Sequence, residues 1–152
     1  MSTNVPSLIL LRGLPGSGKS TFADCVIGGP VVSADDFMVD ELHNYQFNPA
    51  RLPEVHQKCL EEAGTLLREY GSVIVANTFS MRWEMEPYID LAELVGARYF
   101  VVDLFNNGLS TRALAEANTH GVPEETITNM EARWEHNWRD GNPDRPVVRP
   151  PT

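Results

Sequence analysis

The chain has 152 residues, and its length and its hydrophobic content of 42% fit one globular domain with a full core. It carries 12 Lys and Arg against 21 Asp and Glu, a formal net charge of −9, which argues against general nucleic-acid binding but leaves room for a local basic groove. The sequence shows no signal peptide, no apolar run long enough to span a membrane and no disulfide or metal spacing for Cys25 and Cys59, so we expect a cytoplasmic protein without membrane association.

Strand and helix patterns alternate along the chain. Short apolar runs predict strands at 6–12, 31–33, 72–77 and 97–105. Apolar spacing and capping residues predict helices at 18–28, 37–42, 53–70, 81–95, 111–117 and 124–138. This alternation predicts an α/β fold of three layers, with a mainly parallel sheet and helices on both faces. We expect one domain over 1–138 and an extended, proline-rich tail over 139–152.

A phosphate-binding pattern follows the first predicted strand directly. The residues from Gly13 to Ser20 read G-x-x-x-x-G-K-S, between a predicted strand and a predicted helix. Glycines let backbone N–H groups converge on phosphate oxygens, and the start of the following helix adds a partial positive charge. We expect Lys19 to reach the β- and γ-phosphates of ATP and the Ser20 hydroxyl to bind Mg²⁺. The residues predicted to hold the nucleotide are Gly13, Leu14, Pro15, Gly16, Ser17, Gly18, Lys19, Ser20 and Thr21.

Two adjacent carboxylates follow the second predicted strand, at the edge of the sheet where the phosphate loop lies. Asp35 and Asp36 are suited to a kinase, which needs a carboxylate beside the attacking hydroxyl. One acid of the pair is expected to cap the next helix, because Asp is favoured at that position. We predict Asp35 as the catalytic base and place Asp36 among the residues near the acceptor.

The third predicted strand ends in Asn77 and Thr78, where many phosphate-loop proteins place an acid. An amide can hydrogen-bond a phosphate or an attacking group, so both residues are candidates for contact with the acceptor. Alternatively, they only end the strand.

Arginines near the strand-end loops are candidates for neutralising the transferring phosphoryl group. Arg112 is favoured by its position on the predicted lid, and Arg133 on the last predicted helix is a second candidate. Arg82, which begins the helix after the third strand, is a candidate for contact with the acceptor.

The motifs together resemble the polynucleotide-kinase branch of small phosphate-loop kinases. The resemblance runs from the phosphate loop through Ser33-Ala34-Asp35-Asp36-Phe37 and His120-Gly121-Val122-Pro123 to about Glu135. It implies phosphoryl transfer from ATP, with Mg²⁺, to a hydroxyl of DNA or RNA, with Asp35 as the base. Arginines that the polynucleotide kinase of phage has near Met38 and Ala117 are missing here.

The resemblance implies two acceptors. One is the 5′-hydroxyl of a nucleic-acid end. The other is the hydroxymethyl group of 5-hydroxymethyluracil in DNA, which small phage kinases of this type phosphorylate inside a phage-infected host cell. We therefore predict a nucleic-acid hydroxyl kinase, with DNA favoured over RNA and no obligate protein partner. A small-molecule or nucleoside kinase, and a slow nucleotide-binding regulatory module, are the alternatives.

Overall fold

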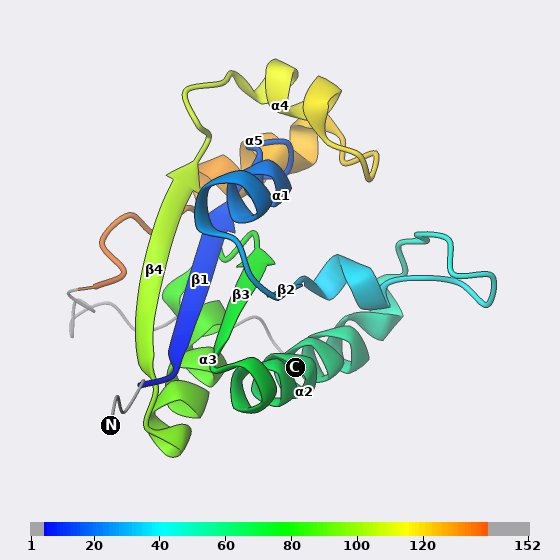
Figure 1. Ribbon diagram of the computed structural model, residues 1–152. Helices are drawn as coiled ribbons and strands as arrows, with labels where there is room; N and C mark the ends of the chain where they lie inside the picture. The colour runs from blue at the N-terminus through cyan, green and yellow to red at the C-terminus, as the bar shows by residue number, and fades with distance from the viewer. Residues whose placement is uncertain (1–4, 140–152) are drawn as a thin grey trace.

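The strands of the computed structural model, which describes residues 5–139, form one parallel sheet with the order β2-β3-β1-β4 (Figure 1). The predicted α/β fold is therefore confirmed. The strand bounds agree with the predicted ranges to within one residue at each end, and they are β1 (Ser7–Gly13), β2 (Val31–Val32), β3 (Ser72–Asn77) and β4 (Arg98–Phe105).

Helices connect the strands and cover both faces of the sheet. The first predicted helix forms as an α-helical turn that continues as a π-helix. The segments are α1 (Lys19–Phe22), the π-helix η1 (Ala23–Ile27), the 3₁₀ turns η2 (Ala34–Phe37) and η3 (Pro49–Arg51), α2 (Leu52–Tyr70), α3 (Arg82–Val95), α4 (Thr111–Ala117) and α5 (Glu124–Ala132).

Side-chain alternation along the central strands divides the core between the two faces. Leu8 and Leu10 of β1 are buried with residues of α2 and α3, whereas Leu11 is buried with Ala23 of η1. The neighbouring strand β3 follows the same rule, because Val73 belongs to the first group. Successive residues of a strand point to opposite faces, so a near-continuous apolar run produces a sheet covered on both sides.

The chain from Met38 to Tyr45 differs from the prediction. A helix was expected over 37–42, but the helical turn η2 ends at Phe37 and an antiparallel bridge joins Val39 to Tyr45. The Asp40 carboxylate accepts hydrogen bonds from the backbone N–H groups of Leu42 and Asn44, both at 2.9 Å. Such local bonds offer the backbone an alternative to the helix, which explains the error. We call residues 38–45 the hairpin.

The last helix is also shorter than predicted, because α5 ends at Ala132 and not at 138. Beyond it, Trp134 and Trp138 are buried, and the Glu135 N–H donates to the Ser80 carbonyl at 2.8 Å. These tertiary contacts replace the helical hydrogen bonds that would have continued α5. Apart from Arg139, the tail predicted over 139–152 lies outside the described residues.

One buried arginine joins the segments that meet at the carboxyl end of β1. The Arg12 guanidinium donates to the carbonyls of Phe79, Ser80 and Glu135 at 2.9–3.1 Å. It also pairs with Asp103 at 3.2 Å and lies 4.1 Å from the ring centre of Trp134. Its side chain is fully buried. Arg12 therefore fixes the β3–α3 loop and the segment after α5 beside the phosphate loop.

Replacing Arg12 by Met is expected to destabilise the fold by about 3 kcal/mol, because three carbonyls and one carboxylate lose their donor. Chemical denaturation with the unfolding midpoint as readout measures the loss. Arg98→Met, an exposed arginine of β4, is the matched control and is expected to change the free energy of unfolding by less than about 0.5 kcal/mol. Equal midpoints for Arg12→Met and the wild type would contradict this role.

Candidate active site

The loop between β1 and α1 has the backbone of a phosphate cradle. The Leu14 N–H donates to the Phe105 carbonyl at 2.9 Å, which ties the loop to the end of β4. Gly16 and Gly18 have φ of 82° and 94°, a region that favours glycine. A Cβ at Gly16 would collide with the carbonyl oxygen of Leu114 in α4. The loop is thus packed directly beneath the predicted lid.

The Lys19 ammonium lies across the mouth of this loop. It donates to the carbonyls of Gly13 and Leu14, at 2.7 Å and 3.1 Å. Burial lowers the pKa of Lys19 to about 8, and the nearby Asp35 carboxylate acts in the opposite direction. Because both of its partners are neutral carbonyls, this ammonium is available to exchange them for anionic phosphate oxygens.

Two further features of the loop fit a nucleoside triphosphate. First, the buried Ser17 hydroxyl has no hydrogen-bond partner among the described residues. Second, the Asn107 amide donates a hydrogen bond to the Ser17 carbonyl at 3.0 Å. Ser20 lies exposed at the start of α1. The residues present therefore fit ATP with Mg²⁺, and the Ser20 hydroxyl would be the protein ligand of the ion. Among residues 5–139, no group of three or more His, Cys, Asp or Glu side chains is placed to hold a metal.

The two neighbouring aspartates have different surroundings. The Asp36 carboxylate accepts a hydrogen bond from the Ser33 N–H at 3.0 Å and completes a capping box around η2. Asp35 instead lies 3.4 Å from His120 Nε2. Its charge opposes the lowering of the Lys19 pKa by burial and adds to the raising of the Tyr45 pKa by burial. Asp35 is thus the carboxylate of the pair whose charge acts on Lys19, and its catalytic role stays a prediction.

Asn77 supports the segment that carries Asp35. Its Oδ1 accepts a hydrogen bond from the Ala34 N–H at 2.8 Å, and its Nδ2 lies 3.8 Å from the Cys59 sulfur. The buried Tyr88 hydroxyl completes this cluster, and burial raises its pKa. Contact between Asn77 and the acceptor stays a prediction, as it does for Thr78, which follows directly after β3.

Removing the Asn77 side chain with Ala is expected to lower the free energy of unfolding by about 1–2 kcal/mol, because the Ala34 N–H loses its acceptor. Thermal denaturation measures this loss. Asn77→Asp keeps an oxygen at the same place and is expected to retain more of the stability. If Asn77→Ala melted at the wild-type temperature, the hydrogen bond to Ala34 would not support this segment.

The candidate arginines do not gather at the loop in this arrangement. The Arg112 side chain is 80% exposed and pairs with Glu116 at 3.4 Å on its own helix. Arg82 donates to the carbonyl of Trp138, and Arg133 to the Ser80 hydroxyl at 3.3 Å. Arg112 would have to move with α4 to reach a bound phosphate, so its proposed role requires closure of the lid.

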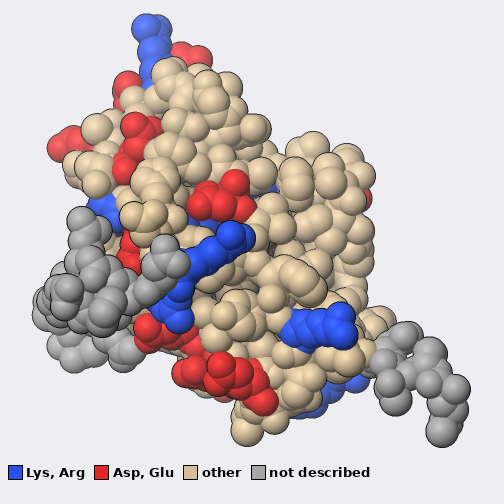
Figure 2. All heavy atoms as spheres, turned by 90° about the vertical axis from the view of Figure 1, so that its left-hand side faces the viewer, with Lys and Arg blue, Asp and Glu red and all other residues tan. Residues whose placement is uncertain are grey.

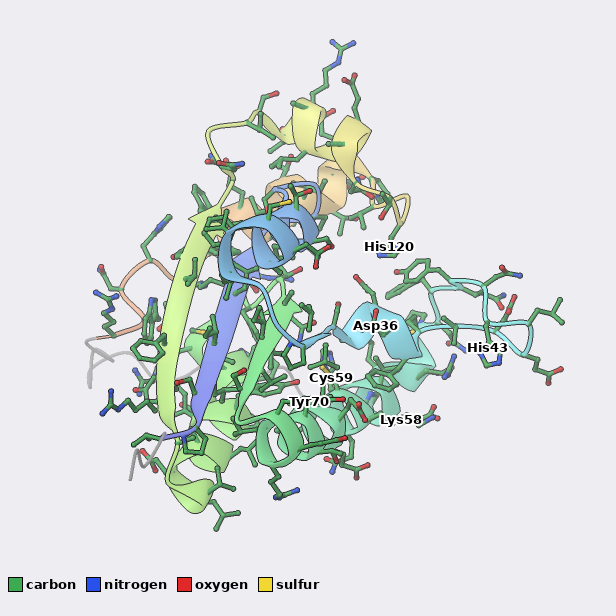
Figure 3. The ribbon with its side chains drawn as sticks, in the orientation of Figure 1. Asp36, His43, Lys58, Cys59, Tyr70 and His120 are labelled. Atoms are coloured by element: carbon green, nitrogen blue, oxygen red, sulfur yellow. The ribbon has the colours of Figure 1, made fainter. Side chains whose placement is uncertain are left out.

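The structure adds two residues, Tyr45 and His120, that the prediction did not place in the site. His120, from the turn between α4 and α5, reaches toward η2 and the hairpin (Figure 3). By contrast, His43 lies at the distant end of the hairpin and away from the site (Figure 3). The Tyr45 and His120 rings are in contact, with centroids 4.1 Å apart. These side chains bring the lid and the hairpin together beside Asp35.

Comparisons with known proteins identify the family of the chain. The family model described as AAA domain matches residues 8–136. Human NEDD4-binding protein 2 is 35% identical over 133 residues, which is 81% of this chain and 7% of that protein. The chain thus spans a small part of this curated relative.

Solved structures share the fold at low sequence identity. A chain in the Pnkp1/Rnl/Hen1 RNA repair complex matches with a TM-score of 0.68 and 20% identity, over 88% of this chain and 45% of that one. A gluconokinase from Sinorhizobium meliloti 1021 matches with a TM-score of 0.53 and 20% identity, over 87% of this chain and 77% of the enzyme. These likenesses confirm the fold expected of the predicted class, an ATP-dependent kinase.

Proposed function

The chain belongs to the AAA domain family and has the fold of ATP-dependent kinases, and we propose that it transfers the γ-phosphoryl group of ATP to a hydroxyl of a nucleic acid. The observation that carries this proposal is the position of Asp35. One carboxylate of the Asp35–Asp36 pair is used for capping, and the other lies close to Lys19 at the mouth of the phosphate loop.

In the proposed reaction the backbone N–H groups of the loop and the Lys19 ammonium hold the β- and γ-phosphates. Mg²⁺, held with the Ser20 hydroxyl, supplies charge neutralisation when it is bound. The Asp35 carboxylate accepts the proton of the acceptor hydroxyl as the hydroxyl oxygen forms its bond to the γ-phosphorus. The bond between the γ-phosphorus and the β,γ-bridging oxygen breaks, and ADP leaves with that oxygen.

One structural neighbour supports a nucleic-acid acceptor. The structural neighbour with the TM-score of 0.68 belongs to an RNA repair complex. We propose a 5′-hydroxyl end or the hydroxymethyl group of 5-hydroxymethyluracil in DNA as the acceptor, with DNA favoured over RNA. The second of these is internal to a strand and would need no contact with a terminal nucleotide.

A small-molecule kinase is the second candidate, and the net charge of −9 and the gluconokinase neighbour favour it. On the side of the molecule where β4 lies, acidic and basic side chains are scattered among uncharged ones (Figure 2). No helix in the described part of the chain is long and apolar enough to cross a membrane.

Label transfer from γ-labelled ATP separates these candidates. The acceptors are single-stranded DNA and RNA with 5′-hydroxyl ends, a duplex that contains 5-hydroxymethyluracil, free nucleosides and gluconate. Label on one of the nucleic acids is the expected result. Label only on nucleosides or gluconate would overturn the proposed acceptor class, and label on none of these compounds would favour the slow regulatory module. A Lys19→Ala sample run alongside identifies any contaminating kinase.

A further inference from the structure

An aromatic pair lies beside the proposed base. The rings of Tyr45 and His120 have centroids 4.1 Å apart and planes inclined by 34°, a tilted arrangement in close contact. Tyr45 ends the hairpin, and His120 belongs to the turn between α4 and α5 (Figure 3). Two segments far apart in the sequence therefore each bring one ring to the same place.

This pair does not fill the core. Neither ring belongs to the three clusters of buried hydrophobic residues within 5–139, and the His120 side chain is 35% exposed. Tyr45 is half-buried. An aromatic ring that is partly exposed at the surface is a face on which a base can stack.

The pair is in direct contact with the reactive region. His120 Nε2 lies 3.4 Å from Asp35 Oδ2. Burial raises the pKa of Tyr45, and the Asp35 carboxylate adds to this shift, which places the phenol within the electrostatic reach of the same carboxylate. A flat ligand on the Tyr45–His120 pair would therefore have its substituents next to Asp35.

We propose that Tyr45 and His120 form a stacking platform for the base of the acceptor nucleotide, so that its hydroxyl faces Asp35. This inference rests on the proposed nucleic-acid acceptor and specifies it as a base that is unstacked from its neighbours. Met38, at the start of the hairpin, is 2% exposed and offers no side chain for recognition.

Fluorescence of 2-aminopurine tests the platform, because stacking on an aromatic ring quenches it. We would titrate single-stranded DNA carrying one 2-aminopurine, at the 5′ end or in the centre, in the presence of a non-hydrolysable ATP analogue. The wild type and Tyr45→Phe are expected to bind and quench. Tyr45→Leu and His120→Ala are expected to bind about 5- to 150-fold more weakly, with little quenching.

Two controls make the test specific. His43→Asn removes a histidine from the distant end of the same hairpin, where the backbone has a φ of 63° that Asn tolerates, and it is expected to behave as the wild type. DNA with an abasic residue in place of 2-aminopurine is expected to bind Tyr45→Leu and the wild type equally. Wild-type affinity for the ATP analogue shows that each variant is folded.

The outcomes separate this inference from the proposed function. If the wild type labels nucleic acid while folded Tyr45→Leu and His120→Ala still bind and quench as the wild type does, the platform is wrong and the proposed function stands. If Tyr45→Leu fails to fold, the His120→Ala result decides. Label transfer only to small molecules would overturn the proposed function itself.

Discussion

Asp35→Asn is expected to lower kcat for phosphoryl transfer by about 10²–10⁴-fold while ATP binding stays close to that of the wild type. The amide has the shape of the carboxylate, but it cannot accept the proton of the attacking hydroxyl. Asp35 is exposed beside the loop and makes no cap, so the substitution removes chemistry without removing a structural contact of the kind Asp36 makes. Single-turnover label transfer at saturating ATP measures the effect.

Asp36→Asn is the matched control in the neighbouring position. Asn keeps an oxygen for the Ser33 N–H and is about as good a capping residue as Asp, so we expect a transfer rate close to that of the wild type. Equal losses for the two variants would show that charge near η2 matters in general and that Asp35 is not the base. A full rate for Asp35→Asn would exclude it as the base.

Lys19→Ala is expected to lower the rate of phosphoryl transfer by at least about 10²–10³-fold. The ammonium donates to two carbonyls of the phosphate loop itself, at 2.7 Å and 3.1 Å. Without the Lys19 ammonium, the negative charge that develops on the β- and γ-phosphates loses the protein cation that the loop supplies. Label transfer and calorimetric titration with ATP measure the rate and the affinity.

The chain's other lysine supplies the control. Lys58 lies on α2 and pairs with Glu54 at 2.9 Å, both side chains being about half exposed. Lys58→Ala removes the same side chain and the same charge, and we expect a transfer rate equal to that of the wild type. If Lys58→Ala lost as much activity as Lys19→Ala, the effect would come from total charge and not from the loop.

Local patterns were enough to predict the parts of the site that are continuous in the sequence. The run from Gly13 to Ser20 needed no tertiary information, because its glycines and its position between an apolar run and a helix already specify the cradle. The strands β1 and β3 were predicted well because buried parallel strands are near-continuous apolar runs. Capping was expected of one carboxylate in the Asp35–Asp36 pair, and Asp36 takes part in it from the third position of η2, where it completes a capping box with the N-cap residue Ser33.

Contacts between distant segments could not be predicted in this way. Arg12 stands out in the sequence because it is a charged residue in an otherwise apolar strand. Its carbonyl partners could not be predicted, since they lie more than 60 positions away. The meeting of His120 with Tyr45 and Asp35 depends on the hairpin, and its first part was predicted as a helix over 37–42. The end of α5 was misplaced for a similar reason, since the contacts of Glu135 are tertiary.

A crystal structure of the chain with Mg²⁺ and a non-hydrolysable ATP analogue tests the central claim most directly. We predict the γ-phosphate in contact with Lys19 Nζ inside the loop, with the Asp35 carboxylate facing it across a gap that admits one hydroxyl. A triphosphate bound away from the loop, or Asp35 turned away from the γ-phosphate, would contradict it.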